Sequence, residues 1–139
     1  MIDVGVLGSA GYTGGELLRL LLNHPSIVRI SPYSRSHANQ SISTVHDDIR
    51  ADDLLFKETA SLKEDSPDVL FMALAHGESR QWLQRESWAG EAVNEGRMKL
   101  IDLSQDFRNE QSPAPNVSFV YGLPELNRAK IQQAQAVSN

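Results

Sequence analysis

Three glycines near the amino terminus constrain the fold more than any other feature of the sequence. Gly8, Gly11 and Gly14 follow the short apolar run 2–7 and precede a leucine-rich segment that begins at Glu16. The apolar run is too short for a helix and is typical of a strand buried on both faces. Glycines between a strand and a helix let backbone N–H groups and the helix dipole approach a pyrophosphate. The motif therefore favours a nucleotide-binding turn; the alternative is that these glycines serve only a tight turn and close packing of helix on sheet.

The remaining segments alternate between strand-like and helix-like patterns. A helix is expected from Glu16 to the residues before Pro25, because proline disfavours helix at the residue that precedes it. The run 27–33 gives a second strand, and this order predicts a parallel pair with a right-handed crossover. Further expected elements are strands at 69–74, 100–103 and 136–139, helices at 79–94 (with Gly96 as its stop) and 128–135, a short edge element at 54–56 within the polar stretch 37–67, and a Pro-containing loop at 112–116. This alternation predicts an α/β fold with a Rossmann-like, doubly wound, mostly parallel sheet and flanking helices, in one domain over 1–139.

The residues that end the second strand indicate which dinucleotide is bound. In folds that prefer NAD, an acidic side chain about 20 residues after the glycine turn holds the ribose 2′-hydroxyl. Here the corresponding residues are Ser34, Arg35 and Ser36, with no carboxylate among them. A guanidinium forms paired, charge-assisted hydrogen bonds with phosphate oxygens, so this segment suits a 2′-phosphate. We therefore expect NADP as the cofactor, with an ordinary surface arginine as the alternative.

Composition narrows the classes of function. The chain has 18 acidic and 13 basic residues, spread along its length, which argues against a nucleic-acid partner. It has no cysteine, so it supplies no disulfide, thiolate metal site or thiol nucleophile. His24, His37 and His46 lack metal-ligand spacing, and we expect no metal. The amino terminus lacks the basic region of a signal peptide, and no apolar run approaches about 18 residues, so we expect a cytoplasmic protein without a membrane partner.

Several motifs together resemble one enzyme family. The segment 8–21, GSAGYTGGELLRLL, and the His-Pro pair at 24–25 are similar to the opening of N-acetyl-gamma-glutamyl-phosphate reductases, relatives of aspartate-semialdehyde dehydrogenase. Further matches follow in the family's order: SRS at 34–36, AHGES at 75–79, IDLS at 101–104, DFR at 106–108 and YGLPELN at 121–127. The resemblance thus spans nearly the whole chain.

The resemblance implies a reaction and its requirements. It is the NADPH-dependent reduction of N-acetyl-glutamyl 5-phosphate, an acyl phosphate, to the semialdehyde with release of phosphate, in arginine biosynthesis. In the family, the thiolate of a cysteine in an Asn-Pro-Gly-Cys segment attacks the acyl phosphate, and the thioester accepts hydride. The sequence given stops at Asn139, so we expect the cysteine just beyond it, no catalytic residue within the chain, and a truncated chain that binds cofactor without activity of its own. A homo-oligomeric parent enzyme is also expected.

Three segments are expected to contact the cofactor: the glycine turn, the end of the second strand and the loop after the strand at 69–74. Their residues are Gly8, Ser9, Gly11, Tyr12, Thr13, Gly14, Ser34, Arg35, Ser36, Ala75, His76 and Gly77. Thr13 either caps the first helix or donates to phosphate, and Ser79 either caps the helix after it or contacts cofactor. His76 follows a central strand, where open α/β sheets bind ligands, and is expected near the nicotinamide. A structural role for His76 is favoured over direct proton transfer.

Other polar residues leave alternatives open. Asp102, Ser104, Asp106 and Arg108 either position a substrate phosphate or bond internally, and an ion pair of Asp106 with Arg108 is favoured. Glu125 either faces the active site or belongs to a packing segment, and Trp82 and Trp88 are expected in the core or at an interface. Competing functions are the paralogous aminoadipyl-phosphate reductase of lysine biosynthesis, a non-catalytic NADP-binding sensor domain, and a purely structural α/β domain.

Overall fold

The apolar run at the amino terminus forms strand β1 (Ile2–Leu7), and the rest of the sheet is arranged around it. The computed structural model describes residues 1–109 and 116–139. Six strands follow the order β2-β1-β3-β4-β6-β5, and each neighbouring pair is parallel. The other strands are β2 (Ile27–Tyr33), β3 (Val69–Met72), β4 (Lys99–Asp102), β5 (Val120–Tyr121) and β6 (Ala136–Ser138). The predicted doubly wound, parallel α/β fold is confirmed.

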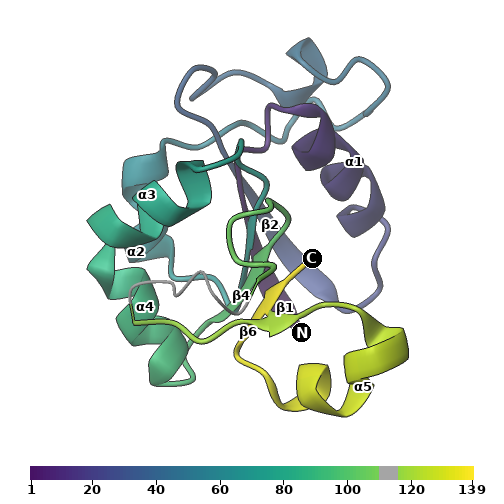
Figure 1. The fold of residues 1–139 in the computed structure, drawn as a ribbon. Helices are drawn as coiled ribbons and strands as arrows, with labels where there is room; N and C mark the ends of the chain where they lie inside the picture. The colour runs from purple at the N-terminus through teal and green to yellow at the C-terminus, as the bar shows by residue number, and fades with distance from the viewer. Residues whose placement is uncertain (110–115) are drawn as a thin grey trace.

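Helices cover both faces of this sheet (Figure 1). One face carries α1 (Tyr12–Leu21), and the other carries α2 (Leu62–Asp65), α3 (Glu78–Arg85) and α4 (Ser87–Asn94), while α5 (Pro124–Gln133) contacts β5 at the end of the sheet. β1 hydrogen-bonds to β2 on one side and to β3 on the other. The chain therefore changes its direction of winding between β1 and β3, and open α/β sheets bind ligands outside the carboxyl ends of such strands.

Alternating side chains along the strands separate two apolar layers. Leu70 and Met72 of β3 pack with α2, α3 and α4, and they belong to a cluster that also contains Trp82. Val69 and Phe71 point to the opposite face, where they pack beside Leu18 of α1 and residues of the 37–67 stretch. This two-residue period is what a strand covered on both faces requires.

Several predicted boundaries are wrong. α1 begins at Tyr12 rather than Glu16, because Gly14 and Gly15 are buried within its first turns. The helix predicted over 79–94 is interrupted at Glu86, whose φ of −102° and ψ of 67° separate α3 from α4. α5 starts at Pro124, ahead of the predicted 128, since proline is tolerated at the first helical position. The predicted stop at Gly96 is confirmed, with φ of +71°.

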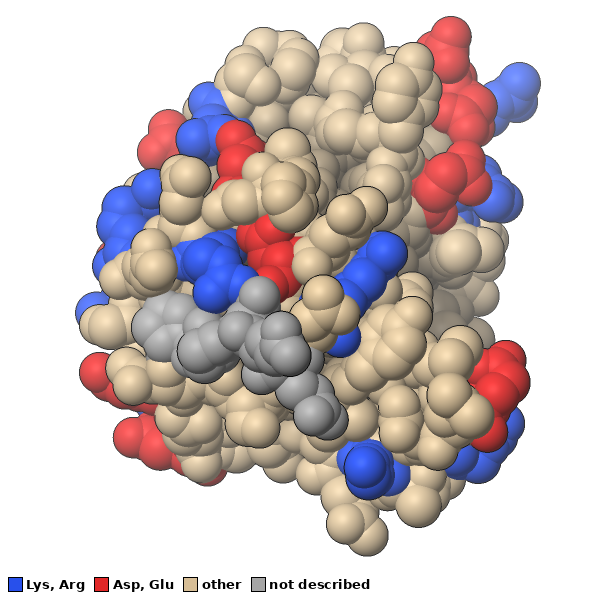
Figure 2. Space-filling view, viewed as in Figure 1, with Lys and Arg blue, Asp and Glu red and all other residues tan. Residues whose placement is uncertain are grey.

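The polar stretch 37–67 contains α2 and short 3-10 turns, Ile42–Thr44 and Thr59–Ser61. The edge element predicted at 54–56 is present as an isolated bridge at Leu55 rather than as a strand. Two isolated bridges tie the stretch to the fold, Tyr33 with Lys57 in parallel and Ser41 with Leu55 in antiparallel orientation. Four residues of the predicted loop at 112–116 lie outside the described residues. Within the described ranges the longest helices have 10 residues, too few for the roughly 20 that cross a bilayer. On the face in Figure 2, acidic and basic side chains are interspersed.

Candidate nucleotide site

A pocket of about 260 Å³ opens at the carboxyl ends of β1, β2 and β3. It is lined by all three predicted segments, which contribute Gly8, Gly11, Ser34, Arg35, Ser36 and Ala75. Sequence reasoning missed its other lining residues, which are Leu7, Ala10, Tyr33, Thr59, Ala73, Leu74, Glu78, Gln81, Trp82 and Arg85. Most of these are apolar or come from α3, and of them only Ala10 and Glu78 fall within the motifs quoted from the sequence.

The three glycines of the turn occupy different environments. Gly8 has φ of +81°, and a Cβ on it would lie 2.5 Å from the carbonyl oxygen of Ala73. A Cβ on Gly14 would lie 2.6 Å from the carbonyl oxygen of Gly8. A Cβ on Gly11 would meet only the Gly8 oxygen, at 3.6 Å. Gly8 and Gly14 are thus required by close backbone packing, whereas Gly11 is exposed and leaves its side of the turn open to the pocket.

Hydrogen bonds within the turn determine which amides remain for a ligand. The N–H groups of Gly8 and Ser9 both donate to the carbonyl oxygen of Tyr33 at 3.2 Å, and the N–H of Gly11 donates to the Gly8 carbonyl at 3.2 Å. Gly11 is the N-cap of α1 and makes no side-chain cap, so the first amides of α1, on Tyr12 and Thr13, are not capped by it. The first amides of a helix have no intrahelical acceptor and attract anions together with the helix dipole.

The predicted side chains of the turn differ in their surroundings. Ser9 is fully buried, and its hydroxyl donates to the Tyr33 carbonyl at 2.9 Å, so its side chain braces the turn from inside. Thr13 lies within α1 rather than at its N-cap, and the predicted capping role for it is wrong. The side chain of Tyr12 is 97% exposed at the start of the same helix.

His46 supports the turn from behind, a role that the sequence did not reveal. Its Nε2 lies 2.8 Å from the carbonyl oxygen of Ser9. A Cβ on Gly15 would lie 2.5 Å from the His46 ring, so the imidazole packs directly against α1. The contact joins residues 37 positions apart, and no local pattern predicts such a pair.

The end of β2 brings an ion pair to the pocket. Nη2 of Arg35 lies 3.3 Å from Oε1 of Glu78, at the start of α3, and these side chains are 70% and 42% exposed. Ser34 is buried and its hydroxyl accepts from the N–H of His37 at 3.3 Å. The Ser36 hydroxyl lies 2.8 Å from Nδ1 of His37. Among the three residues predicted for this segment, Arg35 therefore provides a charged side chain that a ligand can reach.

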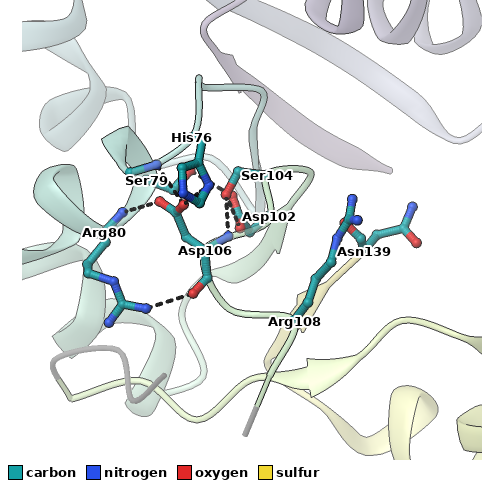
Figure 3. Close-up of polar contacts among 9 residues, drawn as sticks. His76, Ser79, Arg80, Asp102, Ser104, Asp106, Arg108 and Asn139 are labelled. Atoms are coloured by element: carbon teal, nitrogen blue, oxygen red, sulfur yellow. Dashed lines mark hydrogen bonds and ion pairs between the residues drawn. The ribbon is translucent and has the colours of Figure 1, made fainter. Parts of the chain in front are cut away.

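The loop after β3 is held by a carboxylate from the loop after β4 (Figure 3). Asp106 accepts from the N–H of Gly77 at 2.7 Å and from the N–H of Arg80 at 3.0 Å. Gly77, with φ of +82°, is the N-cap of α3, so Asp106 caps this helix from a distant segment. His76 lies between Ala75 and the capped turn, with Nδ1 3.4 Å from Oδ1 of Asp106 and its side chain 79% exposed.

Beneath this cap lies a buried network that includes Ser79 and corrects its predicted capping role. The Ser79 hydroxyl donates to Oδ1 of Asp102 at 2.7 Å, and Gly77 rather than Ser79 is the N-cap of α3. Ser79 is not among the residues that line the pocket. The Ser104 hydroxyl donates to Oδ2 of Asp102 at 2.6 Å and accepts from the N–H of Asp106 at 3.1 Å. Burial raises the pKa of Asp102, and the hydrogen bonds from Ser104 and Ser79 oppose that rise.

The favoured ion pair of Asp106 with Arg108 is also wrong. Nε of Arg108 donates to the carbonyl oxygen of Asn139 at 2.9 Å, and Figure 3 shows its side chain directed toward Asn139 and away from Asp106. Asp106 instead accepts hydrogen bonds from the backbone N–H groups of Gly77 and Arg80. Glu125 is exposed in the first turn of α5, and its alternatives stay open. Trp82 is buried in the core and meets Trp88 edge-on with 6.1 Å between ring centroids, which confirms the predicted packing role.

A second polar cluster surrounds the hydroxyl of Tyr33, a residue that lines the pocket. The hydroxyl of buried Tyr33 donates to Oδ2 of Asp65 at 2.7 Å, and Nζ of Lys57 lies 3.0 Å from the same oxygen. Burial raises the pKa of Tyr33 well above its ordinary value, and Asp65 adds to that rise. Burial also acts to raise the pKa of Asp65, but hydrogen bonds from Tyr33 and Lys57 outweigh it and leave that pKa lowered. Among the described residues, no group of three or more His, Asp or Glu is placed to hold a metal ion.

Comparisons with known proteins agree with this geometry. Residues 3–134 match the family described as semialdehyde dehydrogenase, NAD binding domain. Over the whole chain, the N-acetyl-gamma-glutamyl-phosphate reductases of Parabacteroides distasonis and Azobacteroides pseudotrichonymphae are 44% and 41% identical, and the alignments cover 40% and 41% of those proteins. The resemblance found in the motifs is therefore confirmed.

Solved structures give the same fold. Aspartate semialdehyde dehydrogenase II from Vibrio cholerae matches with a TM-score of 0.69 and 16% identity, covering all of this chain and 38% of that one. The enzyme from Candida albicans, solved with NADP, matches with a TM-score of 0.67 and 18% identity, covering 95% of this chain and 36% of that one. This chain thus spans about two fifths of the length of the curated relatives it matches. The match over residues 3–134 shows that the chain belongs to the semialdehyde dehydrogenase NAD-binding domain family.

Proposed function

We propose that this chain is the NADP-binding part of an N-acetyl-gamma-glutamyl-phosphate reductase. The observation that carries the proposal is the position of Arg35, which lines the same pocket as Gly8 and Gly11 of the turn and whose side chain is 70% exposed. The first amides of α1 are suited to a pyrophosphate, and Arg35 is suited to the additional phosphate that distinguishes NADP from NAD. The donor set therefore fits NADP, and the names of the relatives support the reductase.

When bound, NADPH would supply the hydride of the reaction. The first amides of α1 would hold the pyrophosphate beside Gly11, and Arg35 would hold the 2′-phosphate. His76 and Ala75, at the carboxyl end of β3, would border the nicotinamide end of the cofactor. Asp106 holds the backbone of this loop through Gly77 and Arg80, so these residues would meet the cofactor in a fixed conformation.

An acyl phosphate is the proposed substrate class. Asp102 and Ser104 are buried and bonded to each other, which leaves exposed Arg108 as the candidate of that segment for contact with a substrate phosphate. The relatives compared above are named for the glutamyl substrate, which favours it over the aminoadipyl alternative. A homo-oligomeric parent enzyme and a cytoplasmic location stay predictions.

Calorimetric titration with NADP and NAD tests the proposal. We expect the chain to bind NADP more tightly, and Arg35→Ala to lose about tenfold or more of its NADP affinity while NAD binding changes little, because a hydrogen-bonded charge is removed only from the 2′-phosphate contact. Arg97→Ala is the matched control, since Arg97 is also exposed and paired with a carboxylate, Glu95, at 2.6 Å, but does not line the pocket.

Two results would contradict the proposal. Equal affinity for both dinucleotides, unchanged in Arg35→Ala, would remove the role of Arg35 and the preference for NADP. Absence of binding to either dinucleotide would show that this chain alone forms no cofactor site, either because the glycine turn serves packing alone or because the site needs residues outside the given sequence.

A further inference from the structure

Arg35 already has a partner inside the nucleotide pocket. The ion pair with Glu78 connects the end of β2 to the start of α3, and both side chains line the pocket. The pocket contains one other guanidinium, that of Arg85 at the end of α3, whose Nε lies 3.3 Å from Oε1 of Glu86. Among the described residues that line the pocket, Glu78 is the acidic one and Arg35 and Arg85 are the basic ones.

The same guanidinium donors serve a carboxylate and a phosphate. Arginine binds both anions through the N–H groups of its planar guanidinium. A phosphate must therefore either displace the carboxylate from these donors or share them with it. If Glu78 is displaced, its negative charge remains beside a phosphate of the same sign in a partly enclosed space. Like charges at short distance repel, and this repulsion is larger near a protein surface than in bulk water. Glu78 therefore acts against the group that Arg35 attracts.

The backbone holds Glu78 in this position. It is the first residue of α3, directly after the N-cap Gly77, and the amides of Gly77 and Arg80 on either side are bound by Asp106. A carboxylate in the first turn of a helix is favoured by the helix dipole. The helix dipole thus stabilises the negative charge of Glu78 in the wall of the pocket, where it pairs with Arg35.

From this arrangement we infer that Glu78 is a specificity-determining residue, an internal counter-ion that competes with the 2′-phosphate of NADP for Arg35. The inference rests on the proposed function, because it requires that the pocket bind NADP. NAD has a hydroxyl in place of the 2′-phosphate and does not compete for the guanidinium. Glu78 consequently lowers the affinity for NADP more than the affinity for NAD and narrows the difference between them.

Glu78→Gln tests this inference, because glutamine keeps the size of the side chain and removes its charge. NADP and NAD are titrated calorimetrically into the chain, the variant and a control. The control is Glu95→Gln, which removes the same charge from another exposed ion pair, with Arg97, at the far end of α4. We expect Glu78→Gln to bind NADP about fivefold more tightly, as loss of a competing surface ion pair allows, with NAD binding and the control unchanged.

The double variant Arg35→Ala/Glu78→Gln shows whether the effect passes through Arg35. Competition predicts that Glu78→Gln improves NADP binding far less when Arg35 is absent, and a double-mutant cycle measures that difference. NADP affinity that is unchanged or lower in Glu78→Gln would overturn the inference, as would an equal gain for NAD or a full gain in the absence of Arg35. In each of these cases the wild-type chain still prefers NADP to NAD and loses that preference in Arg35→Ala. Failure of the proposed function would instead abolish dinucleotide binding, or give wild type and Arg35→Ala the same equal affinity for both dinucleotides.

Discussion

The glycines of the turn show that one motif combines residues needed for folding with a residue available for binding. Gly8 adopts a positive φ and lies against the backbone of Ala73, and Gly14 lies against the Gly8 carbonyl. Neither position has space for a methyl group. Gly11 has φ of −81°, which any residue adopts, and its would-be Cβ makes only an ordinary contact. The absence of a side chain at Gly11 therefore matters to a ligand rather than to the fold.

Alanine substitutions at Gly8 and Gly11 should separate these two roles. We expect Gly8→Ala to lower the free energy of unfolding by about 2 kcal/mol or more, because it combines a left-handed backbone with a 2.5 Å clash. Gly11→Ala should cost no more than about 1 kcal/mol, the penalty of alanine in place of glycine at an N-cap whose backbone is not left-handed, yet weaken NADP binding. Urea denaturation and calorimetric titration measure the two quantities. Equal loss of stability in both variants would show that Gly11 is also a packing residue.

Among single residues, the sequence predicted those whose positions follow from counting along the chain. It missed those that reach the site through contacts between distant segments. Arg35 could be found by counting from the glycine turn to the end of β2. His46 and Tyr33 could not, because their contacts with the turn join segments that are distant along the chain. The pairing of Asp106 with Arg108 was wrong for the same reason, since backbone amides of α3 compete for that carboxylate.

Among the elements, α3 depends on a cap supplied by another part of the chain. Its own N-cap is Gly77, which has no side chain, and the carboxylate of Asp106 accepts from the amides at the N-cap and at Arg80. This carboxylate also lies at the positive end of the helix dipole. The loop after β4 thus determines the conformation of the loop after β3, which borders the pocket.

Removal of this cap should loosen one end of α3. We expect Asp106→Ala to destabilise the chain by about 2–3 kcal/mol, because two amides lose a charged acceptor in a buried position. Hydrogen exchange should become faster at the amides of Gly77 and Arg80, and urea denaturation gives the stability. Asp52→Ala, at an exposed site, is the control. Unchanged exchange rates at both amides would contradict the capping role of Asp106, because water would then replace the carboxylate as an acceptor without weakening the protection of these amides.

The 37–67 stretch is connected to β2 through a carboxylate whose charge should make stability depend on pH. The pKa of Asp65 is lowered from 3.8, so its contribution is present above the unfolded value and is lost as pH falls through the lower folded value. We expect Asp65→Asn to cost about 1–2 kcal/mol at pH 7, because the bonds from Tyr33 and Lys57 lose a charged acceptor. The difference from wild type should shrink below about pH 4. Urea denaturation at several pH values measures it, and a difference independent of pH would contradict the assignment.

The order and type of the main elements were predictable, and several of their ends were not. Apolar runs and glycines identify β1, β2, β3 and the helix after each of β1 and β3. The break at Glu86 has no proline or glycine to mark it, so a continuous helix was predicted. The early start of α1 depends on burial of Gly14 and Gly15 against the turn, where packing overrides the low helix propensity of glycine. The first-position proline of α5 did carry a usable signal.

For the molecule as a whole, one sheet separates two apolar layers. Both tryptophans, Trp82 and Trp88, belong to the layer that packs with α3 and α4, whereas Leu18 belongs to the layer beneath α1. The strands between them contribute alternate side chains to each layer, as β3 does. Both layers pack against the same strands, so loss of one layer would expose one face of these strands and remove support from the other layer. We therefore expect the two layers to unfold together.

Leu18→Ala should reveal this coupling. Leu18 is fully buried, so we expect a loss of about 2–5 kcal/mol, whereas Leu20→Ala, on the same helix but 60% exposed, should have little effect. Far-UV circular dichroism reports the whole chain, and tryptophan fluorescence reports the opposite layer. In a cooperative molecule, both midpoints in urea shift together by the same amount in Leu18→Ala. A fluorescence midpoint that stays at the wild-type value while the circular dichroism midpoint falls would show that each face of the sheet unfolds independently.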